Sequence, residues 1–147
     1  MKKIVFCLLA GWMTLSLCAA DLTWLTSLPE AQARAKQENK LVLIDVTGSD
    51  WCLSCKELEL DVFKKPQFID YAKTNLVLLQ IDFPLGIKQS PELEAANIAL
   101  TNQFQVRGFP TILVLNPNGK LVWKEEGYLE GGPKAMIARL NKAEKKK

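Results

Sequence analysis

Two cysteines three residues apart, Cys52 and Cys55, constrain this chain more than any other feature of its sequence. They follow an almost wholly apolar run at residues 41–46, which is typical of a strand covered on both faces, and they open a segment with helical spacing of apolar residues. Because the unpaired N–H groups and the dipole of a helix N-terminus stabilise a thiolate, we expect Cys52 to be the activated sulfur. Residues at i and i+3 share a helix face, so Cys55 is expected to resolve a mixed disulfide formed at Cys52.

The first twenty residues have the pattern of a secretory signal peptide. Two lysines follow Met1, residues 4–17 are almost wholly apolar, and small residues precede a cleavage point after Ala20. The sequence therefore predicts a signal peptide at residues 1–20 and a mature domain at residues 21–147.

Two alternatives to cleavage at Ala20 stay open. The apolar segment could be retained as a membrane anchor, although it is short for a helix that spans a bilayer. The protein could also be a lipoprotein acylated at Cys18, although Leu17 stands where such signals usually carry a small residue.

After cleavage, Cys52 and Cys55 would be the only cysteines, because Cys7 and Cys18 lie in the signal peptide. An exported domain with one such pair uses its sulfur for redox chemistry or metal binding rather than for several crosslinks. The chain has no histidine, so one molecule cannot supply the four nitrogen and sulfur ligands that zinc usually has. We therefore expect no metal and no cofactor besides the redox-active pair; a structural disulfide is the other interpretation.

Charge and length add weaker constraints. The net charge of +3 falls to +1 without Lys2 and Lys3, which suggests neither a nucleic acid nor an anionic membrane as a partner. The mature chain is long enough to bury a core of its own, and no linker or repeat divides it, so we expect one domain.

The remaining pattern predicts an α/β fold with a central mixed sheet, a C-terminal antiparallel hairpin and helices on both faces. Asn118 and Gly119 mark the hairpin turn. In the helix expected at residues 91–105, Leu93, Ala96, Leu100 and Phe104 are predicted to face the sheet. The other expected helices cover residues 29–39, 67–74 and 133–144 and the segment that the cysteines open, and the expected strands cover residues 41–46, 76–81, 111–115 and 120–123.

These elements carry motifs that resemble the thioredoxin-like superfamily over nearly the whole mature chain. The resemblance lies in an acidic residue on the strand, Asp45, the segment from Trp51 to Lys56, the segment Gly108-Phe109-Pro110-Thr111 before a later strand, and Gly127 after the hairpin. The loop that precedes Cys52 is most similar to that of exported bacterial members, including the C-terminal domain of the DsbD type and the periplasmic Dsb reductases. The resemblance implies a thioredoxin fold and a protein thiol:disulfide oxidoreductase.

The resemblance also implies roles for particular residues. Pro110 matches a cis-proline beside the dithiol, and the backbone at Phe109 would pair with an extended substrate segment. Trp51 and Phe109 would form rims of the substrate groove, although aromatic residues in such places are often only packed there. Asp45 would be a buried carboxylate that relays a proton to or from Cys55; its other interpretation is a cap for the turn at the strand end.

Two departures from the family pattern concern this acid. The spacing from Asp45 to Cys52 is one residue longer than in thioredoxin itself, and Leu78 is expected where thioredoxin carries a lysine that pairs with the acid.

The direction of electron flow is judged from the residues between the cysteines. Leu53 and Ser54 bring no charge that would stabilise a thiolate, and less thiolate stabilisation makes a dithiol more reducing. We therefore expect a monomeric periplasmic disulfide reductase that acts on protein disulfides and receives electrons from a membrane donor of the DsbD type. The alternatives are a disulfide isomerase or oxidase, a thioredoxin of cytochrome c maturation, a metallochaperone and a binding module whose thiols are incidental; an anchored protein would face the periplasm.

Overall fold

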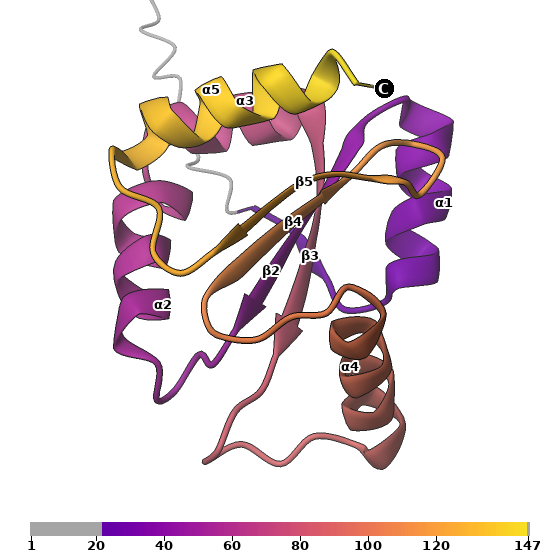
Figure 1. Cartoon of the computed structure of the whole chain (residues 1–147), viewed down its shortest axis with the longest axis vertical. Coiled ribbons are helices and arrows are strands. Elements are labelled where there is room, and N and C mark those ends of the chain that lie inside the picture. The colour runs from indigo at the N-terminus through magenta and orange to yellow at the C-terminus, as the bar shows by residue number, and fades with distance from the viewer. Residues whose placement is uncertain (1–21, 147) are drawn as a thin grey trace, which may run out of the picture.

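The computed structural model describes residues 22–146, so the signal peptide predicted at residues 1–20, with Cys7 and Cys18, lies outside the described residues. The described strands form one mixed sheet in the order β1-β3-β2-β4-β5 (Figure 1). Neighbouring strands β1, β3 and β2 are parallel, whereas β4 is antiparallel to both β2 and β5. The strands are β1 (Trp24–Leu25), β2 (Leu41–Thr47), β3 (Leu76–Asp82), β4 (Thr111–Leu115) and β5 (Leu121–Glu126).

Helices cover both faces of this sheet. Ala31 and Ala35 of α1 (Leu28–Glu38) and Leu100 of α4 (Pro91–Gln103) pack in one apolar cluster. A second cluster, on the opposite face, contains buried residues of α2 (Leu53–Leu58), its π-helical continuation η1 (Glu59–Phe63), α3 (Pro66–Asn75) and α5 (Gly132–Glu144). The predicted α/β class, with a mixed sheet, a C-terminal hairpin and helices on both faces, is confirmed.

Strand β2 lies in the middle of the sheet, and all of its residues are buried. Because successive strand side chains point to opposite faces, Leu41 and Leu43 join the α2 side while Val42 and Ile44 join the α1 side. Asp45 continues the first series, so its side chain points to the face that α2 covers.

Two local features differ from the sequence expectation. Strand β1 was not predicted, because two residues are too few to show any periodicity; it pairs with Leu78 and Leu79 of β3. On α4, Ala96 is exposed and Asn97 is buried, because the Asn97 amide donates a hydrogen bond to the backbone carbonyl of Asp82, 3.0 Å away. A polar residue on the buried side lowers the apolar periodicity on which the prediction rested.

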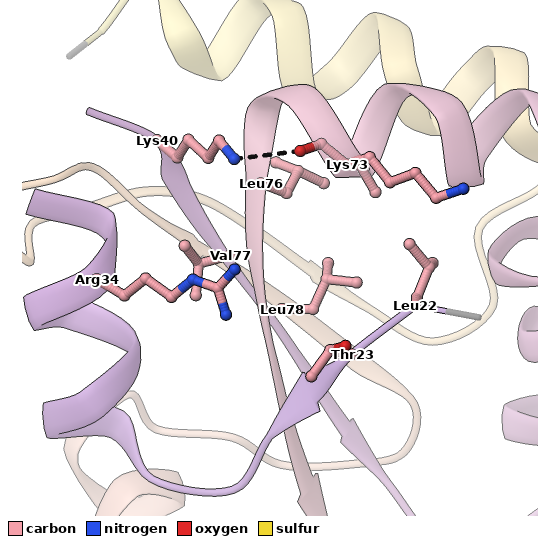
Figure 2. A pocket seen from close by; sticks show the side chains of 9 residues that line it. Leu22, Thr23, Arg34, Lys40, Lys73, Leu76, Val77 and Leu78 are labelled. Carbon is pink, nitrogen blue, oxygen red and sulfur yellow. Dashed lines mark hydrogen bonds between the residues drawn. The ribbon is translucent and has the colours of Figure 1, made fainter. Parts of the chain in front are cut away.

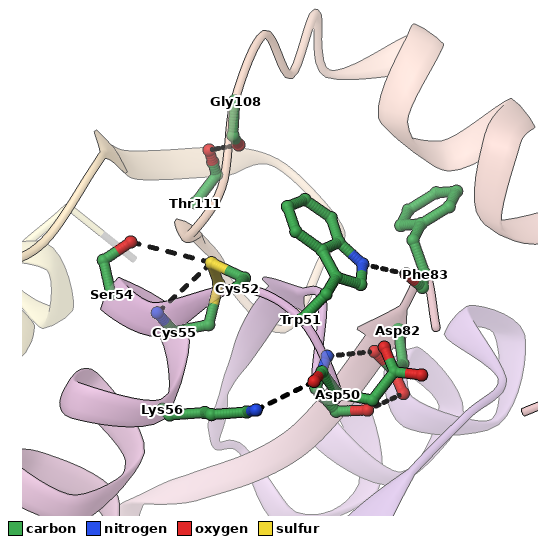
Figure 3. Close-up of a disulfide and its surroundings, with 11 residues drawn as sticks. Asp50, Trp51, Cys52, Ser54, Cys55, Lys56, Asp82, Phe83, Gly108 and Thr111 are labelled. Carbon is green, nitrogen blue, oxygen red and sulfur yellow. Dashed lines mark hydrogen bonds between the residues drawn. A yellow bond between two sulfur atoms is a disulfide. The ribbon is translucent and has the colours of Figure 1, made fainter. Parts of the chain in front are cut away.

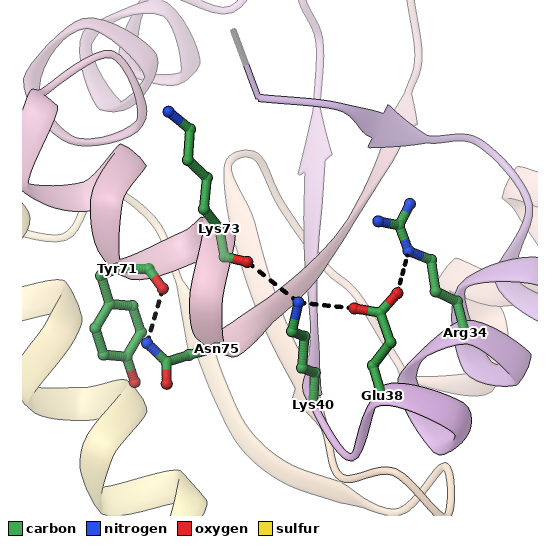
Figure 4. A network of polar contacts seen from close by, with 6 residues as sticks. All are labelled: Arg34, Glu38, Lys40, Tyr71, Lys73 and Asn75. Carbon is green, nitrogen blue, oxygen red and sulfur yellow. Dashed lines mark hydrogen bonds and ion pairs between the residues drawn. The ribbon is translucent and has the colours of Figure 1, made fainter. Parts of the chain in front are cut away.

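A polar network joins the C-terminal end of α1 to the end of α3 (Figure 4). Glu38 accepts from Arg34 and pairs with Lys40, both at 2.7 Å. The Lys40 ammonium also donates to the Lys73 carbonyl at 3.1 Å, which satisfies a carbonyl near the C-terminus of α3. The network therefore fixes the end of the sheet opposite to that from which the cysteines emerge.

The packing of α2 gives a stability prediction. Leu58 is fully buried in the cluster beneath α2, whereas Leu60, two residues later, is 55% exposed. Leu58→Ala should lower the free energy of unfolding by about 3 kcal/mol or more, because it leaves a cavity, and the matched control Leu60→Ala by less than about 0.5 kcal/mol. Urea unfolding of both variants measures this, and equal losses would contradict the assigned packing of α2.

Candidate active site

Cys52 stands where the loop after β2 enters α2 (Figure 3). It is the N-cap residue of α2, and its Sγ accepts a hydrogen bond from the Cys55 backbone N–H at 3.3 Å. The Ser54 hydroxyl lies 3.6 Å from the same sulfur. Cys52 and Cys55 form a disulfide, with their Cα atoms 5.3 Å apart. The sequence prediction of a dithiol at a helix N-terminus therefore agrees with the structure.

A shallow hollow of about 450 Å³ gives access to this disulfide. Cys52 lines it and Cys55 does not, so the hollow opens onto the Cys52 side of the disulfide. The other lining residues are Trp51, Leu53, Ser54, Glu57 and Phe109. Two of the three predicted substrate-binding residues thus lie at the hollow, although they come from segments far apart in the sequence.

Aromatic rings form one wall beside the hollow. The Trp51 and Phe109 rings meet edge to face at 5.5 Å, and Phe83 meets Phe109 in the same way at 5.6 Å. The Trp51 indole N–H donates to the Phe83 carbonyl at 2.8 Å. Gly48 makes room for the indole, because a Cβ there would overlap the Trp51 ring. Sequence reasoning missed Phe83, because nothing in its neighbourhood marks it as part of this site.

Pro110 completes the turn that carries Phe109 to the hollow. The Phe109–Pro110 peptide bond is cis, and Pro110 is buried just before β4 begins. Its carbonyl accepts from the Gly127 N–H at 2.8 Å, and the Thr111 hydroxyl donates to the Gly108 carbonyl at 2.7 Å. The turn is therefore held on both sides of the proline.

Asp45 is buried within the fold on the face covered by α2. Desolvation raises the pKa of its carboxyl to about 7, against an ordinary value of 3.8, and a hydrogen bond with Gln80 opposes this rise. The register pairs Asp45 with Gln80, and it pairs Leu78, expected at the position of thioredoxin's lysine, with Leu43. A neutral amide therefore occupies the position facing the acid on β3, and no ammonium stabilises the ionised form there.

The charged residues beside the disulfide are directed away from it. The Lys56 ammonium donates to the Asp50 carbonyl at 2.8 Å (Figure 3). The Asp50 carboxylate accepts from the backbone N–H groups of Gly86 and Leu85, and these bonds lower the pKa of Asp50. Apart from Cys52 itself, Glu57 is the only described residue with an ionisable side chain that lines the hollow.

Outside the disulfide, the described residues form no second reactive centre. Among residues 22–146, no group of three or more Cys, His, Asp or Glu side chains could hold a metal ion. A second hollow of about 340 Å³ lies at the other end of the sheet, beside Arg34, Lys40 and Lys73 (Figure 2). The charged groups of Lys40 and Arg34 there already pair with Glu38, so this hollow contains no unpaired reactive group from these two residues.

Among residues 22–146, none of the helices has the length and apolar character that crossing a membrane requires.

Known proteins are similar to this chain in sequence and in fold. A family model for the thioredoxin-like domain matches residues 28–144. The disulfide bond reductase DsbH of Chlamydia pneumoniae is 31% identical over 130 residues, which cover 88% of this chain and 77% of that protein. The solved structure of a DsbH oxidoreductase gives a TM-score of 0.80 at 30% identity and covers 91% of this chain and 92% of that one.

A second kind of relative is much longer than this chain. The thiol:disulfide interchange protein DsbD of Pseudoalteromonas atlantica is 38% identical over 88 residues, which are 60% of this chain but 13% of DsbD. The similarity to DsbD therefore concerns one small part of that protein.

A cysteine pair at a helix N-terminus, beside a proline turn on this sheet, defines a thiol:disulfide oxidoreductase with the thioredoxin fold. The chain belongs to the thioredoxin-like family, and within it to the Dsb-type oxidoreductases. Its redox group is the Cys52–Cys55 disulfide.

The raised pKa of Asp45 gives a prediction for stability against pH. Between its ordinary value of 3.8 and about 7, the folded chain keeps a proton that the unfolded chain loses, so the contribution of this group to stability falls as pH rises through about 7. Asp45→Asn should therefore stabilise the oxidised protein little at pH 4 and by at most about 4 kcal/mol at pH 8. Urea unfolding at both pH values measures the difference.

Asp50 supplies a control, because its contribution to stability is expected to change with pH in the opposite direction. Its pKa is lowered, so its contribution to stability is present at neutral pH and is lost as pH falls through the lowered value. Asp50→Asn should therefore destabilise more at pH 7 than at pH 3. A gain from Asp45→Asn that is the same at pH 4 and pH 8 would contradict the buried, proton-retaining state of Asp45.

Proposed function

We propose that this protein is a periplasmic protein disulfide reductase. In its reduced form, the Cys52 thiolate attacks a substrate disulfide, forming a mixed disulfide and releasing one substrate thiol. The Cys55 sulfur then attacks Cys52, which releases the second substrate thiol and forms the Cys52–Cys55 disulfide. Two electrons pass from the protein to the substrate in each cycle.

The position of Cys52 supports its role as the nucleophile. It lines the hollow, and the Cys55 N–H at the start of α2 donates to its Sγ. A backbone donor and the positive end of a helix dipole favour the thiolate, which is the reactive form. Cys55 lies beneath, within bonding distance of Cys52 and away from the hollow, as a resolving sulfur requires.

The proposed direction of electron flow rests on the lack of positively charged residues lining the hollow. A strongly oxidising pair stabilises its thiolate heavily. Here the residues around Cys52 are uncharged except for Glu57, whose negative charge disfavours a thiolate, and Lys56 bonds elsewhere. Weak thiolate stabilisation supports a reducing pair and therefore a reductase rather than an oxidase or isomerase.

Asp45 is proposed as the proton acceptor for Cys55. The Cys55 thiol must lose its proton when it attacks the mixed disulfide, and a carboxylate with a pKa of about 7 can take that proton near neutral pH. Asp45 and Cys55 lie on the same side of the sheet, and the buried carboxylate oxygen Oδ1 has no partner among the described residues. Asp45 Oδ1 is therefore able to accept a proton from a group on this side of the sheet.

The aromatic wall and the proline turn are proposed to hold the substrate. Trp51 and Phe109 border the hollow, and the backbone before Pro110 is placed to pair with an extended segment that carries the disulfide. Main-chain pairing depends little on side chains, which suits a reductase that acts on many protein disulfides.

The proposal also includes where the protein works and which donor reduces its cysteine pair again. The pattern of residues 1–20 supports export, and the related DsbH is named as a disulfide bond reductase. Because the periplasm is oxidising, the pair must be reduced again by a membrane donor, for which a protein of the DsbD type is proposed. Both sulfurs come from one chain, so a monomer suffices for the reaction.

Single cysteine variants test the order of attack. With dithiothreitol as reductant and insulin as substrate, Cys52→Ser should reduce the rate to that of dithiothreitol alone. Cys55→Ser, the matched control, keeps the nucleophile but cannot resolve, so it should accumulate a mixed disulfide with the substrate. Mass spectrometry without reducing agent detects that adduct.

Two outcomes would contradict the assignment. Full activity of Cys52→Ser would remove the enzymatic role of the pair. A stable adduct on Cys55 of the Cys52→Ser variant, with none on Cys52 of the Cys55→Ser variant, would reverse the two roles.

A further inference from the structure

The loop between β3 and α4, residues 83–90, exposes two large apolar side chains. Leu85 is 81% exposed and Ile87 is 62% exposed. Neither belongs to the apolar clusters of the core. Neighbouring exposed apolar side chains on an otherwise polar surface commonly mark a contact with another molecule.

This loop is held in place although the side chains of Leu85 and Ile87 are exposed. The Asp50 carboxylate accepts from the backbone N–H of Leu85 at 3.0 Å and of Gly86 at 2.6 Å. Near the start of the loop, the Ser49 hydroxyl donates to the Asp82 carboxylate at 2.6 Å, and the Trp51 indole donates to the Phe83 carbonyl. Ordering a loop costs conformational entropy, and here several hydrogen bonds from the segment before Cys52 offset that cost. The loop and the cysteine loop therefore form one fixed surface.

The fold brings the two loops together. Strands β2 and β3 are parallel neighbours, and Thr47 at the end of β2 pairs with Asp82 at the end of β3, so the loops leave the sheet at the same edge. The edge-to-face contacts of Phe83 with Phe109, and of Phe109 with Trp51, then connect the loop to the wall of the hollow. Leu85 follows Phe83 by two residues.

We propose that residues 83–90 extend the substrate-binding surface and bind apolar side chains that flank the reacting cysteine in an extended segment of a protein substrate. The inference rests on the proposed function. Any disulfide substrate must bring a sulfur into bonding contact with Cys52, so the chain on either side of that sulfur must lie on the adjoining surface. An extended chain advances about 3.4 Å per residue, so residues a few positions from the cysteine lie outside the hollow, on the surface that adjoins it.

The side chains of this surface indicate which substrate segments it binds. Leu85 and Ile87 offer apolar area, and the two N–H groups that the loop directs toward Asp50 are already paired. Apolar side chains become available in unfolded or misoxidised polypeptides, whose disulfides a reductase must open. The surface therefore favours disulfides with apolar flanking residues over those with polar ones.

Two synthetic peptide disulfides test the proposal. One carries leucines at the positions flanking the cysteine, the other serines, and oxidised glutathione serves as a substrate too small to reach the loop. In the double variant Leu85→Ser/Ile87→Ser, the ratio of kcat/KM for the leucine peptide to that for oxidised glutathione should fall about tenfold, mainly through KM. The ratio for the serine peptide should stay at the wild-type value.

A second variant and a control separate this role from a general loss of structure. Asp50→Ala removes the acceptor that holds the loop while Leu85 and Ile87 remain, and it should lower the leucine-peptide ratio in the same direction. Leu60→Ser/Ile98→Ser changes two apolar residues that are 55% and 45% exposed on other elements, and it should leave the ratio at the wild-type value.

Wild-type ratios in the Leu85→Ser/Ile87→Ser variant would overturn the proposal. So would equal losses for all three substrates, or slower reduction of the variant's disulfide by a membrane donor with normal peptide ratios, since the loop would then serve the donor. Failure of the proposed function looks different: the wild-type protein would reduce neither the peptides nor glutathione disulfide, which would overturn both proposals together.

Discussion

Strand β2 determines where the reactive sulfur lies. It is buried along its whole length between parallel β3 and antiparallel β4, and apolar clusters cover both of its faces. Because its residues pair on both sides, its end at Thr47 is fixed relative to the rest of the sheet. The short loop that follows then delivers Cys52 to the N-cap of α2, where a backbone N–H meets its sulfur. A movement of β2 would move the dithiol, the proline turn before β4 and the loop after β3 together.

The chemistry of the site depends on where charge is absent. On the side of the solvent, uncharged residues and Glu57 surround Cys52, which leaves the helix terminus as the main source of thiolate stabilisation. On the side of the core, the carboxyl of Asp45 faces the amide of Gln80 rather than a cation, and burial raises its pKa to about 7. The disulfide thus has a surface without cations on its solvent side, and the face of the sheet that α2 covers carries a carboxyl that can exchange a proton at neutral pH. This arrangement suits a cycle in which one sulfur attacks and the other must be deprotonated.

Strong local patterns made much of this predictable. The apolar run of β2, the cysteine spacing and the Asn118-Gly119 turn each have a direct physical interpretation, and the structure agrees with them. Features that depend on three-dimensional register were not accessible. Gln80 rather than Leu78 faces Asp45, since a strand register cannot be counted from sequence when its start is uncertain by a residue or two. Asn97 and Phe83 take their roles from partners on other elements, Asp82 and Phe109, which no local pattern reveals.

We propose above that the surroundings of Cys52 make the pair a reductant. The most direct measurement is the equilibrium reduction potential of the Cys52–Cys55 couple in residues 21–147, titrated against glutathione and dithiothreitol buffers and read by thiol alkylation. We expect a value near that of thioredoxin, about −270 mV. A value well on the oxidising side of the glutathione couple, toward the about −120 mV of DsbA, would contradict it and would indicate an oxidase or isomerase.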